Sequence, residues 1–224
     1  MCGRFAQTTD PDDLVRLFQL IGRPSARKRF NLAPTMSITA VRHSPSGRIA
    51  QHTRWGLVPS WAPDLRSGAN MINARSETVF EKRSFARLAR TQRCVIPASG
   101  FYEWRDTPAG KLPTLFQPAE GGALRLAGLF STWADDTGEI TYTSTILTTE
   151  ANRTMRPFHH RMPVLLDGDG ANQWLDATLQ DPSKLTHLFQ SAPESALRLR
   201  ALTTRVNRVV NDDPQCWDPY IDSE

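Results

Sequence analysis

The chain of 224 residues is 39% hydrophobic and contains six Trp, so it can bury one sizeable core, and we expect one domain. Its 27 basic and 23 acidic residues leave a net charge of only +4, which argues against tight non-specific binding to DNA. It has no apolar run near the ~18 residues of a membrane span and no basic-then-apolar leader, so we expect a cytoplasmic protein without membrane contact.

The basic residues and the cysteines narrow the choice of partners. Only four of the 27 basic residues are Lys, and the rest are Arg, whose planar fork suits phosphate. This bias favours an anionic partner, although a GC-rich genome would produce it too. The three cysteines, Cys2, Cys94 and Cys216, are too far apart for a zinc-binding or disulfide pattern. We therefore expect no metal and no cofactor.

The first five residues, Met-Cys-Gly-Arg-Phe, carry the most reactive group in the chain. Removal of Met1 would leave Cys2 with an α-amine and a thiol on adjacent carbons, whose pKa values lie at about 7.7–8.0 and about 8.5. An amine adds to an aldehyde to give a Schiff base, and a neighbouring thiol can close onto the same carbon as a thiazolidine. Cys2 is therefore suited to capturing an aldehyde. The alternative is an ordinary buried thiol at a chain end.

The first half of the chain predicts a helix and a hairpin. A helix of about three turns should start at Pro11, behind an N-cap, because apolar residues recur at helical spacing up to Ile21. Two β-rich segments, 36–43 and 48–56, flank a turn and predict a hairpin. A stiff loop with two Trp and two Pro follows at 54–63. It could stack on nucleobases or pack against the core, and for one of the two Trp we expect the core.

The second half predicts mainly strands. Its strongest strand signal runs through 93–104 and is interrupted by Pro-Ala-Ser-Gly, which indicates a bulge or bend. Because strands dominate, we expect an α+β single domain with a strongly bent mixed or antiparallel sheet, or a partly closed barrel, and flanking short helices. The other predicted elements are strands at 113–117, 124–133, 139–149 and 196–202, and helices ending near 90, near 152–158, at 171–177 and at 182–191.

Several side chains could assist chemistry at Cys2. Glu103 lies within Phe-Tyr-Glu-Trp on a predicted core strand, where burial would raise the pKa of a carboxyl group and suit it to proton transfer near pH 7. A salt-bridged structural role is the alternative for this residue. His159 or His160 could act as a general acid or base. Asn73 can donate and accept hydrogen bonds at once, so it could orient the Cys2 amine.

Six motifs occur in the order found in one protein family. They are MCGRF at 1–5, NLAP at 31–34, RWGLVPSW at 54–61, NARSET at 73–78, FYEW at 101–104 and HHRMP at 159–163. On these motifs the chain resembles the SOS-response-associated peptidase (SRAP) family. The resemblance implies a single SRAP-like domain over 1–224, with a core of about 2–217. It also implies a role in DNA damage repair and the SOS response.

The resemblance implies a covalent activity on single-stranded DNA. Cys2 would capture the ring-opened aldehyde of an abasic site as a thiazolidine DNA-protein crosslink, which protects the lesion from strand cleavage. Removal of Met1 would be autocatalytic, and lyase activity or reversal of the crosslink would be further activities. Such a protein would act as a monomer, associated with the nucleoid when bound to DNA, with replication-fork proteins as further partners.

Residue by residue, the resemblance implies four catalytic residues and five DNA contacts. The catalytic residues are the nucleophile Cys2, Asn73, which holds its amine, Glu103 and His159. His160 occupies the variable position of the His-x-Arg-Met-Pro motif, so the choice of His159 rests on register. The DNA contacts are Arg4, Arg75 and Arg161 on the backbone, Thr148, and Trp61 as a wedge at a bent strand.

Two other functions use the same residues. An N-terminal-nucleophile peptidase or amidase would use the free amine as base and the Cys2 thiol to attack an amide, with Asn73 and Glu103 in support. A non-catalytic module for single-stranded DNA would use Trp55, Trp61 and the Arg residues. The first would turn over amide substrates, whereas the second would bind intact and abasic strands equally and form no covalent product.

Overall fold

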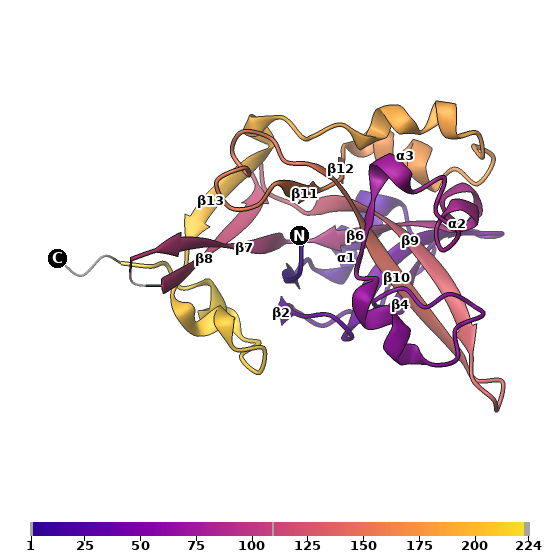
Figure 1. Ribbon diagram of the computed structural model, residues 1–224, viewed down its shortest axis with the longest axis horizontal. Helices are drawn as coiled ribbons and strands as arrows, with labels where there is room; N and C mark the ends of the chain where they lie inside the picture. The colour runs from indigo at the N-terminus through magenta and orange to yellow at the C-terminus, as the bar shows by residue number, and fades with distance from the viewer. Residues whose placement is uncertain (1, 109, 222–224) are drawn as a thin grey trace.

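Five strands of the larger sheet form a closed barrel. The computed structural model describes residues 2–108 and 110–221, and in this part of the chain β9 pairs with both β6 and β10, so that the ring β10-β4-β3-β6-β9 closes on itself (Figure 1). Only the β4–β10 pair within this ring is parallel. The barrel strands are β3 (Ser37–Ser44), β4 (Gly47–Trp55), β6 (Arg93–Ala98), β9 (Leu124–Ala134) and β10 (Ile140–Glu150). The predicted hairpin is confirmed as β3–β4, and the predicted barrel is fully closed.

Three short strands extend the barrel along β9 and β10. The strand β5 (Asn73–Arg75) runs parallel to β10, and β11 (Arg161–Pro163) lies antiparallel to the same strand, with Glu150 opposite Arg161. The strand β12 (Leu165–Leu166) pairs with β9. The C-terminal half of β10 therefore brings two distant motifs, NARSET and HHRMP, to one edge of the barrel.

The second sheet is open and holds the start of the chain. Its strand order is β13-β8-β7-β1-β2, so β1 lies between β7 and β2. The strands are β1 (Phe5–Gln7), β2 (Arg29–Leu32), β7 (Gly100–Thr107), β8 (Gly110–Pro118) and β13 (Leu197–Ala201). Figure 1 shows the N-terminus in the middle of the molecule, beside β7.

The predicted strand over 93–104 is two strands in different sheets. The chain leaves the barrel after β6, turns at Ser99 and enters the open sheet as β7. A Cβ at Gly100 would lie 2.7 Å from Leu115 Cδ1 and 2.8 Å from the Phe116 carbonyl oxygen, so only Gly fits this close approach between strands. The interruption read from the sequence is therefore a corner between sheets.

One apolar core joins the two sheets. The rings of Phe5 in β1 and Trp55 in β4 meet edge-on with centroids 4.8 Å apart, and both side chains are fully buried. Cys2, Phe101 and Ile146 belong to the same buried cluster. Because the cluster includes residues of β1, β7 and the barrel, it fixes the start of the chain relative to both sheets.

The helices are short and differ in part from the prediction. The helix α1 (Pro11–Phe18) begins as expected, with the Asp10 carboxylate accepting from Asp12 N at 3.0 Å, but ends about a turn early, at the left-handed residue Gln19. The helix expected near 152–158 is absent from the described structure, which has turns there, because Pro157 lacks an N–H and disfavours helix in the residue before it.

Two further α-helices lie in the described part, α2 (Ala86–Thr91) and α3 (Gly168–Leu175), and the helix expected at 182–191 is replaced by 3₁₀ turns. The 3₁₀ segments are Leu65–Asn70, Ser76–Thr78, Pro182–Lys184, Thr186–Phe189, Glu194–Ala196, Thr204–Asn207 and Pro214–Trp217. None of the helices between residues 2 and 221, Ala109 apart, is both long enough and apolar enough to cross a membrane.

Candidate active site

Cys2 is fixed at the centre of the molecule by strand pairing. The Arg4 carbonyl accepts a hydrogen bond from Tyr102 N at 3.0 Å, and Phe5 lies opposite Phe101. Cys2 is fully buried just before this pairing begins. Burial, together with the negative charge of Glu103, raises the pKa of the Cys2 thiol well above its ordinary value, so the thiol is protonated near pH 7.

Asn73 holds the main chain at Cys2. Its Nδ2 donates to the Cys2 carbonyl oxygen at 3.0 Å, and its place is set by the register of β5 on β10, where Asn73 lies opposite Ile146. The sequence predicted a contact to the Cys2 amine, whereas the observed contact is to the carbonyl of that residue. Asn73 Oδ1 is buried and accepts no hydrogen bond within residues 2–108 and 110–221, so an acceptor remains next to Cys2.

Glu103 is a buried carboxyl group whose negative charge contributes to the raised pKa of the Cys2 thiol. It lies on β7 two residues after Phe101, on the same face of the strand, and is 8% exposed. Burial raises the pKa of Glu103 to about 6. Near pH 7 the carboxyl group is therefore mostly ionised, and a proton accepted by it is readily released.

His159 is a neutral imidazole with a defined orientation. Its Nδ1 accepts from Arg161 N at 2.9 Å, so Nε2 carries the proton. Burial lowers the pKa of His159 to about 4. The preceding Phe158 packs edge-on against Phe116, which stacks on Phe101, so the segment is anchored on the sheet that carries Glu103. The ring of His160 stacks on His159 but is exposed.

The guanidinium group of Arg161 is already paired with a carboxylate. Nη1 and Nη2 donate to the two carboxylate oxygens of Glu77 at 2.6 and 2.8 Å, and Nη2 also donates to the Thr148 carbonyl. The Arg161 side chain is 12% exposed and that of Glu77 is 50% exposed. Hydrogen bonding to Arg161 lowers the pKa of Glu77 below its usual range. Thr148 is 1% exposed, so its hydroxyl is covered and does not reach the surface.

Arg4 also has partners within the protein. Its Nη1 donates to Asn31 Oδ1 at 2.6 Å and to the Val206 carbonyl at 2.9 Å, and the guanidinium group lies 5.6 Å from the centre of the Trp104 ring. Burial lowers the pKa of Arg4 below its ordinary value. In this structure Arg4 ties the strand after Cys2 to a segment about two hundred residues later.

The remaining candidates differ in exposure. Arg75 is exposed, and Trp61 is 58% exposed with the Arg83 guanidinium 5.5 Å from its ring centre. Trp55 is fully buried and donates through Nε1 to the Ile72 carbonyl at 3.0 Å, which confirms that one Trp of the loop belongs to the core. The structure thus brings Cys2, Asn73 and Glu103 together and leaves Arg75 and Trp61 at the surface.

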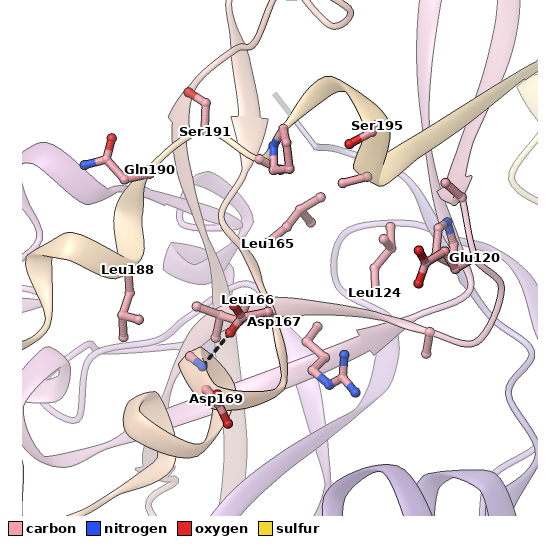
Figure 2. A pocket seen from close by; sticks show the side chains of 18 of the residues that line it. Glu120, Leu124, Leu165, Leu166, Asp167, Asp169, Leu188, Gln190, Ser191 and Ser195 are labelled. Carbon is pink, nitrogen blue, oxygen red and sulfur yellow. Dashed lines mark hydrogen bonds between the residues drawn. The ribbon is translucent and has the colours of Figure 1, made fainter.

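One cavity of the molecule lies away from these residues. About 660 Å³ in volume, it is lined by residues of the β8–β9 turn, β12 and the start of α3, and none of the nine candidate residues lines it (Figure 2). Asp167 in this cavity caps α3 by accepting from Gly170 N at 2.6 Å. Among the described residues, no group of three or more His, Cys, Asp or Glu side chains is placed to hold a metal ion. The candidate active site is therefore the buried start of the chain at Cys2, outside this cavity.

Sequence reasoning missed Glu77 and Asn31. Both lie within family motifs, NARSET and NLAP, but their hydrogen-bond partners Arg161 and Arg4 are distant in sequence. An acidic residue two positions after Arg75 was the only signal for Glu77. A buried Asn that bonds to three carbonyl groups leaves no pattern of its own.

A family model described as "SOS response associated peptidase (SRAP)" matches residues 1–209. The chain belongs to the SRAP family. The SRAP relatives include abasic site processing protein YoqW of Bacillus subtilis, 35% identical over 98% of this chain and 100% of the relative. Abasic site processing protein HMCES of Xenopus tropicalis is 31% identical over 99% of this chain and 79% of its own length.

Solved structures share the SRAP fold seen here. A crystal structure of a protein from Bacteroides thetaiotaomicron superimposes with a TM-score of 0.88 over 98% of this chain and 100% of that one, at 22% identity, which supports the fold alone. A protein from Bordetella bronchiseptica gives a TM-score of 0.79 at 26% identity over 90% of this chain and 100% of that one. The closed barrel with an added open sheet is thus a shared architecture.

Proposed function

We propose that this protein processes abasic sites in single-stranded DNA and captures their aldehyde covalently through Cys2. The single observation that carries the proposal is the juxtaposition at the chain start, where Asn73 donates a hydrogen bond to the Cys2 carbonyl and the charge of the buried Glu103 helps to raise the pKa of the Cys2 thiol. The names of the SRAP relatives, which match over nearly the whole chain, support abasic sites as the substrate.

The reaction we infer begins when Met1 is released by hydrolysis of its peptide bond, which frees the Cys2 amine. As the deoxyribose hemiacetal opens, the bond between C1′ and the ring oxygen breaks, and the proton of the C1′ hydroxyl passes through Glu103 to that oxygen, to which His159, neutral and protonated at Nε2, can donate a hydrogen bond. The amine then condenses with the C1′ aldehyde, forming a C=N bond and releasing one water. Asn73 Oδ1, still unused as an acceptor, is available to hold the amine.

Ring closure requires a base. The Cys2 thiol is protonated, so it cannot attack the imine as a preformed thiolate. Glu103, with a pKa of about 6, can take the thiol proton while sulfur bonds to C1′. The same proton then passes to the former imine nitrogen. The product is a thiazolidine, and the whole sequence from aldehyde and aminothiol loses one water.

Binding of the strand is assigned to the surface around this centre. An abasic nucleotide presents no base, so nothing has to be flipped out before the sugar enters. Arg75 is free to meet a phosphate, and Trp61 exposes a ring on which a base can stack. Arg161 can meet a phosphate only if Glu77 releases its fork. The proposal includes a monomer in the cytoplasm, with replication-fork proteins as candidate partners.

Intact mass of the untagged protein tests the proposal. The protein is incubated with a single-stranded oligonucleotide that bears one abasic site, and a sugar-reduced oligonucleotide, which has no aldehyde, serves as control. We expect a mass equal to the chain from Cys2 plus the oligonucleotide less one water, and no adduct with the control. Unmodified protein that lacks Met1 would overturn capture. It would direct attention to amide substrates, although a protonated thiol is a poor nucleophile for an amide.

A further inference from the structure

A loop near the C-terminus is held in place by one buried side chain. We call residues 206–211 the C-terminal arm. Asn31 is fully buried, and its Nδ2 donates to the carbonyls of Val206 at 3.1 Å, Arg208 at 3.1 Å and Asn211 at 2.7 Å. Because this one amide group is hydrogen-bonded to three carbonyls of the arm, it fixes the path of the arm's main chain.

The end of the arm is fixed as firmly. Asp212 Oδ1 accepts from Phe30 N at 2.6 Å and from Asn31 N at 3.0 Å, and the same carboxylate pairs with Arg29. Its side chain is only 17% exposed. The arm is therefore a built part of the fold, joined to β2, and not a loose tail.

The arm is also bonded to both strands that carry the candidate site. Arg4, two residues after Cys2, donates to the Val206 carbonyl at 2.9 Å. Trp104, directly after Glu103, donates through Nε1 to Asn207 Oδ1 at 2.7 Å. A strand of DNA that brings its sugar to Cys2 would pass close to this arm.

The tip of the arm presents apolar side chains to solvent. Val209 is 38% exposed and Val210 is 83% exposed, although the rest of the arm is held by a buried polar network. Both are β-branched and stiff at χ1, so they form a defined apolar tip. Arg208 beside them is exposed, and it forms no ion pair within residues 2–108 and 110–221. An apolar tip flanked by a free cation suits a base and its phosphate.

We propose that Val209 and Val210 pack against the face of the base next to the abasic nucleotide, with Arg208 near a phosphate. The reasoning is that a missing base leaves its neighbour unstacked on one face. Apolar side chains can cover such a face, as wedges in bent DNA do. This inference rests on the proposed function. It assigns the NLAP motif and the polar C-terminal segment to substrate binding, through Asn31 and the arm.

The test replaces Val210 by Ser, which leaves the charge unchanged and removes no buried contact. Ile140→Ser is the matched control, because Ile140 is 58% exposed at the start of β10, on the hairpin at the opposite end of the view in Figure 1. Affinity is measured with the sugar-reduced abasic oligonucleotide, which binds without reacting. We expect Val210→Ser to weaken binding about fivefold and Ile140→Ser to leave it unchanged.

A second oligonucleotide isolates the base. In it the nucleotides on both sides of the reduced site also lack bases. Wild-type protein and Val210→Ser should bind this oligonucleotide with equal affinity, because the base contact that the substitution removes is already absent. Equal affinity of variant and wild type for the first oligonucleotide would overturn the proposal, as would a loss that persists without neighbouring bases. A change of oligomeric state in Val210→Ser would assign the tip to a second copy of this chain instead.

Failure of the proposed capture would look different. In that case wild-type protein would form no adduct with the unreduced oligonucleotide, while the base-dependent loss of affinity in Val210→Ser would still be seen. If capture holds, the variant should react at saturating DNA within about twofold of the wild-type rate. A side chain that only contacts a base of the bound strand changes the DNA concentration needed for half-saturation, and it leaves the rate of the bond-forming steps unchanged.

Discussion

The open sheet and the barrel edge contribute to the candidate site in different ways. The open sheet places Cys2 and Glu103 in a buried setting, where the pKa values of both groups are raised. The barrel edge, through β5 and β11 on β10, brings Asn73, Arg75 and Arg161, of which Asn73 faces Cys2 and Arg75 lies at the surface.

This difference has a physical reason. Proton transfer benefits from a low dielectric, which shifts the pKa values of carboxyl and thiol groups, whereas phosphate binding needs cations that stay solvated until DNA arrives. Reactive groups therefore belong in the core and DNA-binding cations at its rim. Variants of Cys2 and Glu103 in and beside the open sheet should change chemistry, and variants of Arg75 and Arg161 at the barrel edge should change affinity.

The largest effect is expected from Cys2→Ala. Without the thiol no thiazolidine can close, so stable adduct should be abolished, while binding to the reduced oligonucleotide stays near the wild-type affinity. Intact mass measures adduct formation, and a binding titration measures affinity for the reduced oligonucleotide. A stable adduct that persists in this variant would show that Cys2 is not the capturing residue and that the open sheet does not hold the chemistry.

Glu103→Gln should slow capture by about 100-fold at pH 7 with affinity unchanged, because the thiol then lacks its base. In wild-type protein the rate should rise as pH passes through about 6, the pKa of Glu103. His159 has a pKa of about 4 and stays neutral over this range, so it adds no inflection there. Single-turnover rates from pH 5 to 7 test this, below the rise that the Cys2 amine adds near its own pKa of about 7.7–8.0. An inflection near pH 6 that remains in the variant would exclude Glu103 as its source.

The same substitution should stabilise the fold at high pH. The pKa of Glu103 rises from an ordinary 4.5 to about 6 on folding, so the folded state holds the proton more tightly. Stability should fall as pH rises from about 4.5 to about 6, by about 2 kcal/mol for this group. Glu103→Gln should then melt about 5 °C higher than wild type at pH 8, and at about the same temperature at pH 4. Lower stability of the variant at pH 8 would mean that the ionised carboxylate supports the fold.

Glu77→Gln should act on affinity alone. The carboxylate occupies the fork of Arg161, so its loss should free a cation for phosphate and tighten binding to single strands about threefold at low salt. Glu81→Gln, which makes the same charge change at an exposed neighbour, is the control. Weaker binding by Glu77→Gln would mean that Glu77 orients Arg161 toward DNA instead of competing with it.

Local patterns in the sequence predicted the hairpin β3–β4 and the start of α1 because alternation, a turn and an N-cap act between neighbouring residues. The same patterns overestimated α1, since Ile21 fits the helical spacing but is 53% exposed after a left-handed residue at Gln19. They also could not divide 93–104 between two sheets, because the close packing at Gly100 involves Leu115 and Phe116 of another strand.

The sequence by itself determined which reactive groups the chain carries, namely an aminothiol once Met1 is removed and a carboxyl group among aromatic residues. Its motifs also indicated the family. Only the tertiary structure decided which groups meet and which are already paired. Asn73 reaches Cys2 across 71 residues, Arg161 reaches Glu77 across 84, and Arg4 reaches Val206 across 202. Such contacts depend on how the two sheets pack over one core. The raised pKa of Glu103 and the pairing of the Arg161 guanidinium group with Glu77 follow from this packing, because burial and hydrogen-bond partners are properties of the folded chain.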